Sequence, residues 1–161
     1  MNVQITNKQK GFTIIEVVLV LAIAGLIFLM VFIALPALQR SQRDTQRRND
    51  LSRAQTAVNN YRTSNRNALP TVSDFNTRVR DTYLKADGDT FEDPTRGEYF
   101  FVAGKGAGQY PAYLQTGAVG EAEIWVDLST KCKGEDVMPS GSRSVALRMA
   151  LEGGGTACLG V

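Results

Sequence analysis

The sequence predicts an α+β protein, in which a long N-terminal helix with a transmembrane first half packs on a small antiparallel β-sheet domain. Three observations predict this class. Residues 12–38 are almost wholly apolar, residues 39–66 continue with helical spacing of apolar side chains, and residues 67–161 contain short strand-like segments separated by turns. We therefore expect an amphipathic second helical half over 39–66 and a globular head over 67–161.

The apolar run from Phe12 to Leu38 is interrupted only by Thr13, Glu16 and Pro36. About 20 such residues, each rising 1.5 Å, cross the ~30 Å hydrocarbon core of a bilayer. A cleaved secretory signal fits poorly, because its apolar stretch is normally about 7–15 residues long. The run therefore predicts a transmembrane helix.

Charge and cysteine give conflicting signals about orientation. Residues 1–66 carry 9 − 3 = +6 and residues 67–161 carry 9 − 13 = −4. The lysine and arginine count alone places the C-terminal side in the cytoplasm, whereas the acidic half with Cys132 and Cys158 favours export. The two cysteines suit one disulfide or two reduced core thiols. We expect the N-terminus inside and the C-terminal domain outside.

Composition also excludes several kinds of chemistry. Histidine is absent, which rules out histidine triads and histidine-ligated metals, and two cysteines cannot form a four-ligand zinc site. No nucleophile elbow or phosphate-binding motif is present, and the glycine-rich stretch 104–108 predicts a flexible turn. We therefore expect no enzyme activity, no cofactor and no metal.

The segment Lys10-Gly11-Phe12-Thr13-Ile14-Ile15-Glu16, followed by the apolar run, resembles the start of type IV pilins and related pseudopilins. The resemblance implies the type IV pilin fold and a short leader, residues 1–11, like that of the type IVa class. Prepilin peptidase would cut after Gly11 and methylate Phe12. Glu16 would then be the fifth mature residue and would serve filament assembly.

The position of Glu16 agrees with this role on physical grounds. It lies four residues after Phe12, on the same helix face, and can neutralise its own amine or that of a neighbour. The alternative is that Glu16 lies at the membrane edge and reaches water. Gly25 and Pro36 bracket a stretch of weakened helical hydrogen bonding, and the extent of any melting there stays open.

Three functions compete. The resemblance favours a structural subunit of a type IV pilus, anchored in the cytoplasmic membrane and then assembled on the cell surface. The alternative is a pseudopilin of a type II secretion or DNA-uptake machine, and the least supported is a membrane-anchored binding domain or enzyme. Expected partners are other copies of the chain, prepilin peptidase, the inner-membrane assembly machinery and membrane lipid. A late disulfide, Cys132–Cys158, resembles the one bounding a surface loop in many pilins, and favours pilin.

The second helical half has an apolar stripe suited to packing on a core, formed by Leu51, Ala54, Val58 and Tyr61. Its arginines are Arg40, Arg43, Arg47, Arg48 and Arg53. We expect them to contact lipid headgroups and, after assembly, acids of neighbouring subunits. Nucleic acid is a weaker alternative, because no aromatic residues lie between them.

The head is expected to begin with a short helix over 74–84, capped by Ser73. An acidic loop follows, and Asp87, Asp89 and Asp93 in it predict a solvated turn in preference to a calcium site. Strands are expected at 98–103, 122–128, 143–151 and 156–161. The third should have one face in water, because apolar residues alternate along it.

Overall fold

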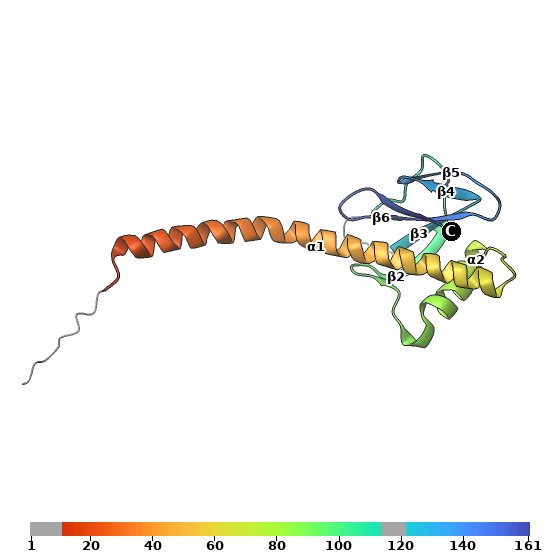
Figure 1. Cartoon of the computed structure of the whole chain (residues 1–161), viewed down its shortest axis with the longest axis horizontal. Coiled ribbons are helices and arrows are strands. Elements are labelled where there is room, and N and C mark those ends of the chain that lie inside the picture. Colours follow the sequence, from red (N-terminus) through yellow and green to blue (C-terminus); the bar gives the residue numbers. More distant parts are fainter. Residues whose placement is uncertain (1–10, 114–121) are drawn as a thin grey trace, which may run out of the picture. The chain divides into compact units, whose positions relative to one another are not determined.

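The computed structural model describes residues 11–113 and 122–161. It divides into two compact units, one up to Gln39 and the other Arg40–Val161. The helix α1 (Ile14–Ser64) belongs to both, and its second half forms part of the head (Figure 1). The architecture is α+β and type IV pilin-like, with a long apolar N-terminal helix and a mixed β-sheet.

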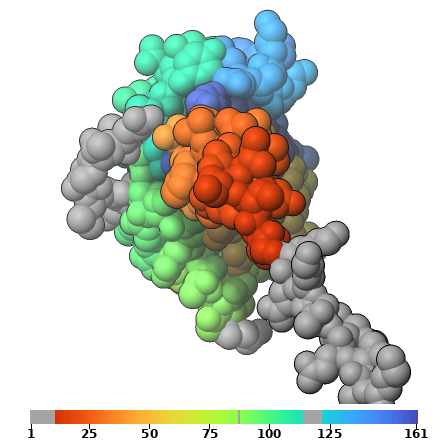
Figure 2. Space-filling model, turned by 90° about the vertical axis from the view of Figure 1, so that its left-hand side faces the viewer, coloured from red at the N-terminus to blue at the C-terminus, as the bar shows by residue number. Residues whose placement is uncertain are grey.

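The first half of α1 is helical throughout, including the stretch between Gly25 and Pro36. Its large apolar side chains are exposed, from 47% at Leu35 to 85% at Ile14 (red and orange in Figure 2). Within the described residues, α1 is the one helix long and apolar enough to cross a membrane. A helix that is apolar on all sides requires either lipid or other helices around it.

A second, irregular helical region follows α1. It consists of α2 (Val72–Asp74), the π-helix η1 (Phe75–Leu84) and the 3-10 helix η2 (Ala86–Gly88). The expected cap at Ser73 is wrong, because Thr71 caps α2 and forms a capping box with Asp74. Thr71 and Asp74 have the three-residue spacing that this motif needs.

The main sheet has the order β1-β2-β3-β6-β7, and its strands are β1 (Glu92–Asp93), β2 (Gly97–Ala103), β3 (Ala122–Leu128), β6 (Val145–Ala150) and β7 (Thr156–Gly160). The sheet is mixed, so the expectation of a purely antiparallel sheet is wrong. Strands β2 and β3 pair in parallel. Parallel neighbours need a crossover connection, and β2 and β3 are therefore joined by a long link rather than a tight turn.

A hairpin that the sequence analysis did not predict lies outside this sheet. It joins β4 (Thr130–Lys133) to β5 (Asp136–Pro139) in antiparallel register. A disulfide joins Cys132 of β4 to Cys158 of β7, with their Cα atoms 5.8 Å apart. The covalent link therefore ties the hairpin to the last strand of the main sheet.

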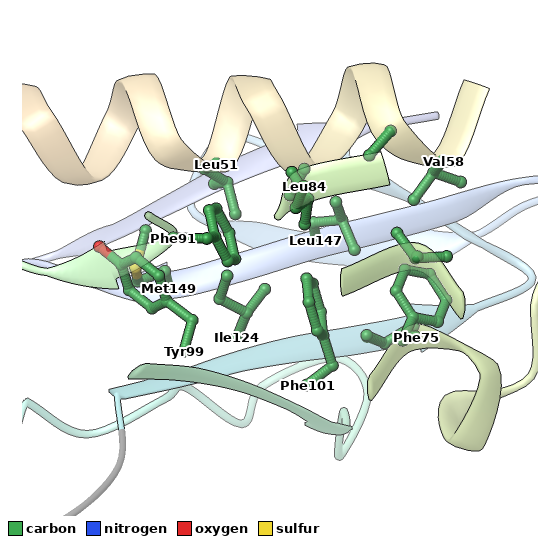
Figure 3. Packing of buried hydrophobic residues seen from close by; sticks show 14 of the residues in the cluster. Leu51, Val58, Phe75, Leu84, Phe91, Tyr99, Phe101, Ile124, Leu147 and Met149 are labelled. Atoms are coloured by element: carbon green, nitrogen blue, oxygen red, sulfur yellow. The ribbon is translucent and has the colours of Figure 1, made fainter. Parts of the chain in front are cut away.

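The hydrophobic core lies between the second half of α1 and one face of the main sheet (Figure 3). The predicted stripe of Leu51, Ala54, Val58 and Tyr61 is buried, as expected. It packs against the aromatic residues Phe75, Phe91, Tyr99 and Phe101 and the sheet residues Ile124 and Leu147. Burial of this stripe fixes which face of the helix the head covers.

The opposite face of β6 is also buried, so the expectation that this strand has one solvent-exposed face is wrong. Arg148 is fully buried and donates to Asp127 at 2.8 Å and to the carbonyls of Gly106 and Gln109. Asp127 and Asp136 in turn accept hydrogen bonds from the amides of Gly106 and Gly108. The 104–108 stretch, expected to be a flexible turn, is therefore held by hydrogen bonds at Gly106 and Gly108.

Candidate functional site at the start of the long helix

Thr13 and Glu16 cap the N-terminus of α1 reciprocally. Both the amide and the hydroxyl of Thr13 donate to Oε2 of Glu16, at 2.9 and 2.7 Å. The amide of Glu16 reaches back to Thr13 Oγ1 at 3.4 Å. These contacts satisfy two of the helix-terminal amides that have no partner in the backbone.

This cap uses only one oxygen of the Glu16 carboxylate. Within the described residues, Oε1 makes no hydrogen bond, and Glu16 itself is exposed. Glu16 borders a shallow apolar hollow of about 480 Å³, together with Phe12, Val17, Val20 and Leu21. The arrangement places one free carboxylate oxygen beside a surface suited to an apolar partner.

Gly11 and Phe12 lie just before this cap and are exposed, Phe12 by 90%. A Cβ atom added to Gly11 would meet no other atom within 4 Å. The fold of the chain therefore gives no steric reason for glycine at this position. Any requirement for glycine at this position would therefore come from another molecule that binds this segment. Most of the expected leader, residues 1–10, lies outside the described residues.

A ladder of alternating charges on the second half of α1 holds the head to the helix. Asp44, Arg47, Asp50 and Arg53 follow one another at intervals of three residues. Arg47, 1% exposed, donates to Asp93 at 2.6 and 3.1 Å and to Asp44 at 3.0 Å. The spacing of three, with alternating sign, is the signal in the sequence that could have identified the pairs within the helix, Asp44–Arg47 and Asp50–Arg53.

The arginines of α1 pair mainly within the chain, which differs from the expectation that they contact lipid headgroups and acids of neighbouring subunits. Arg40 and Arg43 form ion pairs with Glu152, Arg47 pairs with Asp93, and Arg53 pairs with Asp89. Arg48 is exposed and makes no ion pair within the described residues. Four of the five arginines thus already have an acidic partner in a single subunit, which weakens both the lipid and the nucleic-acid interpretations.

The acidic loop is only partly the solvated turn that was expected. Asp89 is exposed but forms an ion pair with Arg53 at 2.7 Å, and Asp93 is 6% exposed and pairs with Arg47. Among the described residues, no group of three or more acidic, histidine or cysteine side chains is arranged to hold a metal. Asp93 therefore serves the packing of the head on the helix.

Comparison with known families finds a match at the start of the chain. Residues 6–32 match the family described as the prokaryotic N-terminal methylation motif, which is the signature of type IV pilins and their prepilins. No curated protein and no solved structure matches the chain. The fold and this motif together define the class as type IV pilin-like.

Within that class, the motif supports a prepilin-type or pseudopilin-type protein. The motif implies processing by prepilin peptidase and assembly of the processed chain into a pilus-type structure. Its apolar N-terminal helix is consistent with anchoring in a membrane before assembly.

Proposed function

We propose that this chain is a structural subunit of a type IV pilus, cut between Gly11 and Phe12, methylated on Phe12 and assembled through its N-terminal helix. The observation that carries the proposal is the first half of α1. Its large side chains are exposed on every face, and Glu16 is its single acid. Such a helix is stable in lipid before assembly and in a bundle of identical helices afterwards.

Glu16 is proposed to neutralise the Phe12 amine of a neighbouring subunit. After cleavage, each subunit has one positive amine and one carboxylate near the same end of the helix. Burying either charge alone is costly, whereas burying the pair is tolerated. The free Oε1 atom can accept that amine while Oε2 keeps the helix cap.

A pilin is favoured over a pseudopilin by the disulfide between Cys132 and Cys158. The bond bounds the C-terminal part of the head, which resembles the disulfide-bounded surface loop of many pilins. It also supports export of the head, because stable disulfides form in oxidising compartments. We accordingly propose that the N-terminus starts on the cytoplasmic side and that the head lies outside.

Intact-mass measurement of filaments sheared from cells tests this function. The subunit should lack residues 1–11 and carry one additional methyl group. A Gly11→Leu chain should stay uncut in the membrane, whereas a control Gly141→Ala chain, altered at an exposed turn in the head, should be cut and assembled normally. Finding uncut subunits in assembled filaments would overturn the proposal.

A further inference from the structure

A polar groove lies on the head, between the second half of α1 and the region from η1 to the acidic loop. Its volume is about 300 Å³, within the range of small-molecule sites. It is lined by Ser52, Arg53, Thr56, Ala57, Asn60, Tyr83, Leu84, Ala86 and Asp89. The π-helix η1 ends in this lining, and π-helical turns are frequent at functional sites.

Several polar groups in the groove have spare hydrogen-bonding capacity. Within the described residues, the hydroxyls of Ser52 and Tyr83 and the side-chain amide of Asn60 make no hydrogen bond, and Asp89 uses only Oδ2. These groups include donors, acceptors and groups that can be either. They converge on one hollow, so a ligand rich in hydroxyl groups could satisfy several at once.

The charges in the groove cancel. The Arg53 guanidinium lies 2.7 Å from Asp89 and 3.3 Å from Asp50, and it also donates to the carbonyl of Thr90. It is therefore already neutralised and is a poor site for a phosphate or a carboxylate. Asp89 is paired in the same way, which makes it a poor site for a cation.

The rest of the lining is apolar. Ala57, Leu84 and Ala86 contribute aliphatic surface, and the half-buried Tyr83 ring is held edge-on to Tyr61 at 6.2 Å between centroids. A fixed aromatic ring with a polar tip suits a ligand that has both a C–H face and hydroxyl groups. Neutral sugars have this combination.

From these features we propose that the groove binds a neutral sugar residue through Ser52, Asn60 and Tyr83. This inference goes beyond the filament role and does not depend on it, because the groove lies wholly within the head. Because the groove belongs to one subunit, a single chain should bind the sugar before any assembly.

The test uses the full-length chain in a detergent without a sugar headgroup, with glucose, galactose, mannose and N-acetylglucosamine as probes in ligand-observed NMR. At least one of them should bind. Asn60→Ala should weaken binding about tenfold, the effect of losing one or two hydrogen bonds. Asn59→Ala is the matched control: it alters an exposed asparagine of the same helix that does not line the groove, and binding should be unchanged.

Tyr83→Phe provides a second variant that keeps the ring and removes only the hydroxyl, and it should weaken binding with the fold intact. Failure of all four sugars to bind would overturn the proposal, as would equal losses in Asn60→Ala and Asn59→Ala. Stronger binding of inorganic phosphate than of any sugar would also overturn it, because that would assign the groove to anions.

Discussion

One guanidinium, that of Arg47, holds both oxygens of the Asp93 carboxylate, with Nε 2.6 Å from Oδ2 and Nη2 3.1 Å from Oδ1. The two side chains are 1% and 2% exposed. Arg47 belongs to α1 and Asp93 to β1, so the pair fixes the first strand of the head to the helix. Bidentate pairs of this kind give geometric specificity as well as attraction.

Replacing Arg47 by Met should strongly destabilise the head. Loss of one partner leaves the buried Asp93 carboxylate without its cation, which typically costs about 3–5 kcal/mol. Urea unfolding of the full chain in detergent, followed by the fluorescence of the buried Trp125, measures this. Arg48→Ala, at the next residue and exposed, should change stability by less than about 0.5 kcal/mol. Similar losses in both variants would contradict the importance of the pair.

Stability should fall in acid because of Glu152. Hydrogen bonds from Arg43, at 2.6 and 2.7 Å, lower the pKa of Glu152 from 4.5 to about 2. A carboxylate with a lowered pKa contributes stability that is complete above its unfolded value and is lost as the pH falls towards the folded value. The free energy of unfolding should therefore decrease between about pH 5 and pH 2.

Glu152→Gln should flatten part of this acid dependence and lower stability at neutral pH. Some slope should remain, because hydrogen bonds from Arg47 and Thr95 outweigh burial and also lower the pKa of Asp93. Glu92→Gln, at an exposed acid, is the control and should leave the pH profile unchanged. An unchanged profile in Glu152→Gln would show that the Arg43 pair does not act in solution.

The disulfide should stabilise the head substantially. It closes a loop of 158 − 132 + 1 = 27 residues, and the chain-entropy model gives roughly 3–4 kcal/mol for that length. Paired Cys132→Ser and Cys158→Ser substitutions should lower the urea midpoint accordingly. Thiol labelling of freshly sheared, unreduced filaments should find no free thiol. Two labelled cysteines there would contradict both the bond and the inferred export.

Gly104 should not tolerate a side chain. A Cβ atom at this position would lie 2.2 Å from Cγ and Oδ1 of Asp127, a residue already fixed by Arg148. Gly104→Ala should therefore force the buried pair apart and cost about 1–3 kcal/mol or more, as overpacking does. Gly141→Ala has open space around it and should be nearly neutral. Thermal unfolding of the two variants side by side gives the comparison.

The sequence alone predicted those features whose residue spacing fits a single kind of structure. The apolar stripe of Leu51, Ala54, Val58 and Tyr61 predicted the buried face of α1, because a period of 3.6 residues puts them on one side. The strand expected over residues 122–128 has the same bounds as β3. Likewise, the segment 10–16 that carries the resemblance lies within residues 6–32, which match the methylation motif.

Other features depend on partners that are distant in the chain. Alternation along 143–151 indicated a strand with a wet face, yet Arg148 is buried because Asp127 and the 104–109 segment cover it. Charges three residues apart on a helix usually face solvent, so nothing local showed that Arg47 meets Asp93. The parallel pairing of β2 and β3 depends on the crossover between them, which strand patterns do not reveal.

The most direct test of the proposed assembly compares Glu16→Ala with the unchanged chain in cells that make filaments. The variant should reach the membrane in normal amount, because removing an intramembrane carboxylate lowers an insertion cost of about 2.5–3.5 kcal/mol. It should nevertheless be missing from the sheared filament fraction, because a neighbour's Phe12 amine would lose its partner. Glu92→Ala, in the head, should assemble normally. Filaments of normal amount built from the Glu16→Ala chain would contradict the account.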